Sequence, residues 1–153
     1  MEFTLRPATQ ADAWSIRWLV WRAALNPTDL AWQRFIVATG PDGKVIGCGQ
    51  IKPHKDGTHE LASITVERQW RGQGVASAVI QRLIQQHPDT LYLMCRSPLG
   101  PFYHRFDFRS IEEAQMPPYF RSVSRLVRKL NRLRPGREGL LVMKRPGILP
   151  ETA

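Results

Sequence analysis

Cysteine is scarce in this chain of 153 residues, which contains only two. Two thiols exclude the disulfide framework of a small secreted protein, and Cys48 and Cys95 each lie in an apolar run, so we expect buried thiols in a reducing compartment. Long hydrophobic runs are also missing, because no stretch reaches the roughly 18 consecutive apolar residues that a membrane-spanning helix needs. The first six residues lack the charged-then-apolar build of a signal peptide. The expected location is therefore cytoplasmic.

Several signatures of catalytic and metal sites are absent as well. The cysteines and histidines show no Cys-x-x-Cys or His-x-x-x-His spacing, so no metal site is predicted. The chain has no Gly-x-Ser-x-Gly nucleophile elbow and no Gly-x-x-x-x-Gly-Lys-Ser/Thr phosphate loop. Internal repeats and low-complexity tracts are also lacking.

The chain does contain enough apolar material for one hydrophobic core, with 42% hydrophobic residues. This length fits a single domain. The net charge of +9 is unevenly distributed, because residues 119–138 alone carry +6 and residues 1–118 carry +2. A hypothesis of nucleic-acid binding would therefore depend on one basic segment.

The hydrophobic pattern predicts a mixed α/β domain. A helix rich in tryptophan is expected between Thr9 and Asn26, and Asn26–Asp29 is expected to cap a short second helix that ends near Trp32. The tryptophans of the first helix are interpreted as core residues or as the wall of a substrate pocket. Strands are expected over residues 3–6, 35–38, 45–52, 60–66, 91–95, 108–111 and 139–144, and further helices over residues 75–87, 101–106 and 119–134.

The most informative segment is a strand that runs directly into a glycine-rich turn, Arg71-Gly72-Gln73-Gly74, which opens a helix. Glycines let backbone N–H groups approach a ligand closely, and the first turn of a helix offers free N–H groups at the positive end of its dipole. The pattern indicates a phosphate or pyrophosphate site. A dinucleotide-binding fingerprint is excluded because its third glycine is replaced by Ser77. The alternative is that the glycines only turn the chain.

Residues 66–76, Val-Glu-Arg-Gln-Trp-Arg-Gly-Gln-Gly-Val-Ala, resemble the acetyl-CoA loop of the GNAT superfamily of N-acetyltransferases. The signature of that loop is Arg/Gln-x-x-Gly-x-Gly/Ala after a strand ending in Val, and Arg71, Gly74 and Ala76 fill its fixed positions. The resemblance extends to the strand order, to Leu5-Arg6-Pro7-Ala8-Thr9 and to the segment from Phe102 to Phe108. It covers roughly residues 3–111 and a final strand at 139–144.

The resemblance implies a GNAT-like α/β fold, with a central mixed, splayed β-sheet flanked by helices and a basic helical insertion before the last strand. We expect a single domain over residues 1–146, the insertion at 119–136 and a loose tail at 147–153. Acetyl-CoA would be the co-substrate and would lie between the parallel strands 60–66 and 91–95. The cofactor-binding residues implied are Ile64, Thr65, Val66, Arg71, Gly72, Gln73, Gly74, Val75, Ala76 and Ser77.

Within this set, the backbone groups of Ile64, Thr65 and Val66 would pair with the pantetheine arm as an added strand would. The amides of Gly72 to Ser77 would hold the pyrophosphate. A backbone N–H near Ile64 would polarise the thioester carbonyl.

Two further residues are implied as catalytic. Glu60 occupies the position where the family often carries a general base, and its alternative is a solvent-facing glutamate at a strand end. His54 and His59 are rival bases, or ordinary turn histidines. Tyr103 matches the tyrosine that protonates the CoA thiolate, and its alternative is an aromatic packing residue. An asparagine that often contacts CoA is replaced in this chain by Arg96 and Ser97.

These features predict an N-acetyltransferase that transfers acetyl from acetyl-CoA to a primary amine of a small molecule or peptide, by direct attack in a ternary complex. The amphipathic basic segment 119–134 is interpreted as a helix packed by its apolar stripe, as an electropositive wall, or as a docking surface. The alternative function is a catalytically weak CoA-binding or regulatory module that docks on nucleic acid or anionic membrane through this helix. The sequence leaves the acceptor and the choice between monomer and homodimer open.

Overall fold

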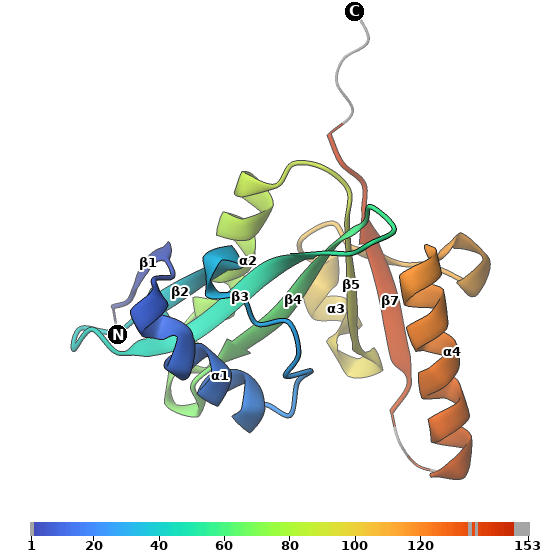
Figure 1. Ribbon diagram of the computed structural model, residues 1–153, viewed down its shortest axis with the longest axis horizontal. Coiled ribbons are helices and arrows are strands. Elements are labelled where there is room, and N and C mark those ends of the chain that lie inside the picture. The colour runs from blue at the N-terminus through green and yellow to red at the C-terminus, as the bar shows by residue number, and fades with distance from the viewer. Residues whose placement is uncertain (1, 135, 137, 149–153) are drawn as a thin grey trace, which may run out of the picture. The chain divides into compact units, whose positions relative to one another are not determined.

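The computed structural model describes residues 2–134, 136 and 138–148 (Figure 1). Its strands form one mixed seven-stranded sheet in the order β1-β2-β3-β4-β5-β7-β6. The predicted mixed α/β class is confirmed. The strands are β1 (Thr4–Pro7), β2 (Phe35–Thr39), β3 (Val45–Pro53), β4 (His59–Val66), β5 (Leu91–Arg96), β6 (Arg109–Ser110) and β7 (Leu140–Arg145), and the helices are α1 (Ala13–Arg22), α2 (Val75–Gln86), α3 (Gly100–His104) and α4 (Pro118–Leu133).

Two compact units make up the chain. The first comprises the residues up to Lys52 together with Leu61–His87, and the second comprises Pro53–Glu60 together with the residues from Pro88 onward. The parallel pairing of β4 with β5 sets Glu60 opposite Tyr92, two residues of the second unit. The predicted single domain over residues 1–146 and the predicted splay between these strands stay predictions.

In the first unit, alternate residues of each strand point to opposite faces of the sheet. On one face, α1 contributes to a core cluster of Ala8, Ile16, Leu19, Val20, Phe35, Val37 and Cys48. On the other face, Gly47 and Gly49 of β3 lie against α2, where a Cβ atom would come within 2.9 Å of Val75 Cγ1 or Val79 Cγ1. The missing side chains let α2 pack close to the sheet, and this packing positions the start of α2 beside the end of β4.

In the second unit, β7 pairs in antiparallel register with both β5 and β6. Helix α4 runs alongside β7 (Figure 1) and inserts the fully buried Phe120 against the ring of Tyr92, at a centroid distance of 5.1 Å. Met116 and Val142 complete this core cluster. The helix predicted over 119–134 is therefore present, whereas its status as an insertion relative to the family stays a prediction.

One predicted element is wrong. Residues 26–31 form a loop in place of a capped second helix, and only a short 3-10 turn, Trp32–Arg34, follows. The physical reason is local: the Asn26 side chain accepts hydrogen bonds from the backbone and hydroxyl of Thr28, and Asp29 adopts a left-handed φ of 57°. Such bonds compete with helix formation.

The last described residues are hydrogen-bonded. Gly147 N donates to Thr90 Oγ1 and Ile148 N donates to the Pro88 carbonyl, while the rest of the expected loose tail, 149–153, lies outside the described residues. None of the helices formed by the described residues combines the length and the apolar character needed to cross a membrane.

Candidate functional site

The turn between β4 and α2 has a backbone that favours glycine. Gly72 and Gly74 adopt φ values of 79° and 82°, in the left-handed region, and no atom outside the neighbouring residues lies within 4 Å of a Cβ built on either. Gly74 is the N-cap of α2, which begins at Val75. The turn is therefore bare of side chains at the point where the helix opens.

The first amides of α2 face out of the helix without intrahelical partners, as at any helix start. The N–H of Ala78 already donates to the Gly74 carbonyl at 3.1 Å, so Val75, Ala76 and Ser77 supply the open N–H groups. Arg71 is exposed just before them, and its Nε donates to the Val66 carbonyl at 3.3 Å. Helix dipole and guanidinium together make this corner attractive to an anion.

Strand β4 is kinked at a residue that sequence reasoning missed. Ser63 lies in the strand with a left-handed φ of 60°, and its hydroxyl accepts a hydrogen bond from Nε2 of the fully buried Gln50 at 2.9 Å. The Cys48 thiol also donates to the Ser63 carbonyl, at 3.6 Å. The kink comes directly before Ile64, Thr65 and Val66, whose backbone is predicted to bind the pantetheine arm. A serine gives no sequence signal for this conformation.

Glu60 is buried and paired, which differs from the solvent-facing alternative. Its Oε1 lies 2.7 Å from His54 Nε2, and the two side chains are only 8% and 10% exposed. His54 comes from the β3–β4 turn, where its backbone N–H donates to the Thr58 carbonyl. His59, the other predicted rival base, is the first residue of β4. His54 therefore stands beside the predicted base, in the same unit.

Tyr103 lies in α3 among aromatic rings. It makes edge contacts with Phe102 and Phe108, at centroid distances of 5.1 Å and 6.3 Å. Burial raises the pKa of Tyr103 to about 12, with a further contribution from the Cys95 thiol. The phenol therefore keeps its proton at neutral pH, which is required of a general acid.

The two parts of the predicted site fall in different units. The cofactor-binding residues from Ile64 to Ser77 belong to the first, and Glu60 and Tyr103 belong to the second. Near the strand end where the family's asparagine is missing, Ser97 Oγ donates to the Gly139 carbonyl at 2.8 Å. Within the described ranges, no group of three or more His, Cys, Asp or Glu side chains comes together that could hold a metal ion.

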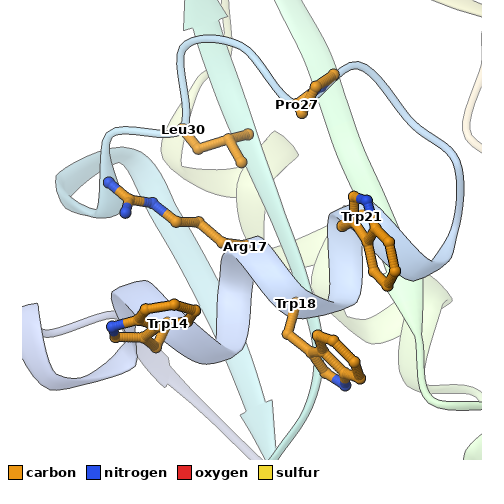
Figure 2. Close-up of a pocket in the computed structure, with 6 residues that line it drawn as sticks. All are labelled: Trp14, Arg17, Trp18, Trp21, Pro27 and Leu30. Carbon is orange, nitrogen blue, oxygen red and sulfur yellow. The ribbon is translucent and has the colours of Figure 1, made fainter.

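The tryptophans of α1 do not enter the core. Trp14, Trp18 and Trp21 are 79%, 51% and 66% exposed, which corrects their interpretation as core residues. With Arg17 and with Pro27 and Leu30 of the following loop, they line a hollow of about 350 Å³ (Figure 2). An apolar hollow of this size is large enough for a small ligand.

The strand order, the glycine turn and the open start of α2 define the fold of an acetyltransferase. The profile of the acetyltransferase (GNAT) family matches residues 5–108, more than half of the chain, and the chain belongs to this family. It is therefore an acyltransferase that uses acetyl-CoA. A comparison with curated proteins finds no significant match.

Several solved structures share the fold. Rv2747 from Mycobacterium tuberculosis, crystallised in complex with CoA and NLQ, is 25% identical with a TM-score of 0.71, and the match covers 95% of this chain and 99% of that one. The ribosomal-protein-S18-alanine N-acetyltransferase from Escherichia coli is 18% identical with a TM-score of 0.71, over 99% of both chains. N-acetylglutamate synthase from Neisseria gonorrhoeae, complexed with coenzyme A and N-acetyl-glutamate, is 16% identical with a TM-score of 0.72, over 97% of this chain and 36% of that one.

Proposed function

We propose that this acetyltransferase moves the acetyl group of acetyl-CoA to a primary amine of a small molecule or peptide, by direct attack of the amine in a ternary complex. The observation that carries the proposal is the helix start at Gly74, where a left-handed glycine leaves the amides of Val75–Ser77 open beside Arg71. These amides and the helix dipole would hold the diphosphate of CoA.

The rest of the cofactor would follow β4 toward the acetyl end. Backbone groups of Ile64, Thr65 and Val66 would pair with the pantetheine arm, and the Ser63 kink would change the direction of the strand just before them. Arg71 Nε already donates to the Val66 carbonyl, whose second lone pair would accept from pantetheine. An N–H near Ile64 would stabilise the oxyanion of the tetrahedral intermediate.

The chemistry needs one base and one acid. Glu60 takes a proton from the acceptor ammonium, directly or through water, because a protonated amine with a pKa near 10 cannot attack. The amine nitrogen then bonds to the thioester carbon, and the carbonyl becomes an oxyanion. Collapse of the intermediate breaks the carbon–sulfur bond, and Tyr103 gives its proton to the thiolate.

The phenolate left on Tyr103 must regain a proton before the next turnover. Burial raises the pKa of Tyr103 to about 12, whereas a free thiol has a pKa near 8.5. The phenolate is therefore the stronger base, and it recovers a proton from the nitrogen of the N-protonated amide that collapse of the intermediate leaves. The sum is one ammonium and one acetyl-CoA converted into one amide, one CoA thiol and one released proton.

The acceptor is best sought among amines carried by amino acids and peptides. One structural relative is an N-acetylglutamate synthase and another acetylates an alanine of a ribosomal protein. In this chain the hollow between α1 and the 26–31 loop would hold an apolar part of the acceptor against Trp14, Trp18 and Trp21. A polyamine is less favoured, because a chain with a net charge of +9 repels a polycation.

The alternative of a regulatory module that docks on nucleic acid or anionic membrane is not supported, since the family and the structural relatives are acetyltransferases. We propose a cytoplasmic location, because Cys48 and Cys95 are buried, unbridged thiols of the kind that persist in a reducing compartment.

An acetyl-CoA consumption screen tests the proposed function. The full chain is incubated with acetyl-CoA and a panel of amino acids, peptides and other amines, thiol release is followed, and products are identified by mass spectrometry. We expect thiol release that depends on the amine and matches the amide formed. Acceptor-independent thiol release, or none across the panel, would count against the proposal.

A further inference from the structure

A buried histidine accompanies the predicted base. His54 Nε2 and Glu60 Oε1 are 2.7 Å apart, a distance typical of a hydrogen bond with an ionised partner. Both side chains are at least nine-tenths buried. A buried carboxylate is stable only where donors replace water, so the imidazole is a principal partner of this carboxylate.

The imidazole is itself held in place by α4. The ring of Tyr119 stacks on it at a centroid distance of 3.7 Å, and the ring of Phe120 meets it edge-on at 5.6 Å. The backbone N–H of Tyr119 donates to Asp56 Oδ2 at 3.2 Å, which ties the first turn of α4 to the turn that carries His54. The ring plane is therefore fixed by residues more than 60 positions away in the sequence.

This arrangement separates the roles of two candidate bases. A ring that donates Nε2–H to Glu60 cannot use the same nitrogen to take a proton from an amine. The carboxylate remains the group that accepts the proton. His54 keeps its own proton throughout the turnover.

We propose that His54 is a positioning residue for Glu60: it donates Nε2–H to Oε1, orients the carboxylate and favours its ionised form, and the first turn of α4 locks the imidazole in that pose. This inference rests on the proposed function of Glu60 as the general base. It assigns α4 a part in catalysis that the basic character of the helix does not suggest.

The titratable and charged groups on the elements packed around the His54–Glu60 pair come from five elements. They are Glu60 of β4, Asp56 of the β3–β4 turn, Tyr119 of α4, and Tyr92 of β5, which lies opposite Glu60 and has Lys144 Nζ of β7 at 6.0 Å from its ring. Burial acts to raise the pKa of Asp56, but hydrogen bonds from Thr58 and Tyr119 and the charge of His54 lower it overall. The pKa of Asp56 is therefore held below its ordinary value.

Two substitutions separate positioning from packing. His54→Phe keeps an aromatic ring for Tyr119 to stack on but removes the donor, whereas His54→Gln keeps an N–H donor but loses the aromatic stack. We expect His54→Phe to lower kcat/KM about tenfold at pH 8 and to move the acid limb of the pH profile to higher pH, because a lost hydrogen bond disfavours the charged carboxylate. We expect His54→Gln to recover most of the activity and the normal acid limb, with CoA affinity unchanged in both.

The reverse order of activities would overturn the inference. If His54→Phe matched the natural chain while His54→Gln lost activity, the ring would act only by packing. An independent readout is the ring nitrogen NMR spectrum of the full chain, in which we expect His54 to carry a proton at Nε2. A ring protonated at Nδ1 alone would contradict the pairing. A failed acceptor screen would remove the proposed function yet leave this spectrum unaffected, so the two failures are distinguishable.

Discussion

The hydroxyl of Tyr103 shows how surroundings decide what one residue can do. Its ring is packed between Phe102 and Phe108, and this burial raises the pKa to about 12. The phenol is thus protonated over the whole range in which the enzyme works. Its proton transfer to a departing thiolate is therefore transient, because the phenolate is the stronger base and regains a proton from the amide nitrogen.

Removing the Tyr103 hydroxyl should slow the chemical step and leave the affinity for CoA nearly unchanged. We expect Tyr103→Phe to lower kcat about 100-fold, within the usual range for loss of a general acid, with the Kd for CoA changed less than about twofold. Steady-state kinetics and calorimetric titration with CoA measure the two quantities, and thermal melting controls for the fold. A variant with unchanged kcat would show that Tyr103 serves only in packing.

The raised pKa of Tyr103 also predicts how kcat changes at alkaline pH. Because the pKa is raised, the proton-bearing form persists as pH rises and is lost only near pH 12. We therefore expect no fall in kcat that can be assigned to Tyr103 between pH 8 and about pH 10, where an ordinary phenol would begin to titrate. A decline in that range that disappears in Tyr103→Phe would contradict this prediction.

Asp12 is a second single residue with an identifiable role, because its carboxylate stabilises the fold. Both its oxygens accept from Arg6, at 2.7 Å and 2.9 Å, and one also accepts from the Thr9 backbone. The pair with Arg6, aided by Thr9, lowers the pKa of Asp12 despite its burial. With a folded pKa below the unfolded one, its stabilisation is present at neutral pH and is lost as pH falls through the folded value.

We expect Asp12→Ala to lower the free energy of unfolding by about 1–3 kcal/mol at pH 7, because it removes a buried carboxylate that accepts hydrogen bonds from Arg6 and from the Thr9 backbone. Urea denaturation at pH 7 and at pH 3 measures the change, with the exposed Asp89→Ala as the matched control. The difference between the two variants should shrink at pH 3. An equal difference at both values would rule out the ionised carboxylate as the cause.

At the scale of elements, the start of α2 has a natural internal control. Gly74 and Gly43 adopt φ values of 82° and 80°, and neither has an atom within 4 Å of a built Cβ. Alanine at either position therefore carries the same backbone strain, about 1–2 kcal/mol. Only Gly74 lies at the predicted diphosphate site.

We expect Gly74→Ala to weaken CoA binding by about tenfold, because the new methyl group stands between the amides and the diphosphate. We expect Gly43→Ala to bind CoA normally while losing similar stability. Calorimetric titration and urea denaturation of both variants make the comparison. Equal loss of CoA affinity in the two would indicate general destabilisation.

The elements also show what sequence patterns can and cannot predict. The glycine turn is a local signal, and both its conformation and the start of α2 at Val75 follow from adjacent residues. The His54–Glu60 pair depends on a turn, a strand and the stacking of Tyr119, so no local pattern reveals it. The Ser63 kink depends on the buried Gln50, and the 26–31 loop depends on side-chain bonds that override helix propensity.

At the scale of the whole molecule, the positive charge of α4 is carried by residues other than those predicted to bind CoA or to catalyse the reaction. The arginines of α4 are engaged in part, since Arg125 and Arg128 both pair with Glu113 and Arg121 donates to backbone carbonyls. The pairs with Arg128 and Arg125 lower the pKa of Glu113 to about 2. This organisation neutralises part of the positive charge of the helix.

Direct attack makes a prediction for the complete enzyme. In a ternary complex no acetyl group is carried by the protein, so we expect the intact mass of the chain to stay unchanged after incubation with acetyl-CoA alone. Initial rates should give intersecting double-reciprocal lines when both substrates vary. An acetylated chain that passes its acetyl group to an amine would replace direct attack by a two-step mechanism.

The most direct measurement of the central claim is an NMR titration of the full chain with CoA, followed through the backbone amides. We predict that the amides of Gly72, Gly74 and Val75–Ser77 shift together and saturate with one CoA per chain, because these groups would hold the diphosphate. A saturating titration that leaves these amides unmoved, or that moves only amides of the basic helix α4, would contradict this placement.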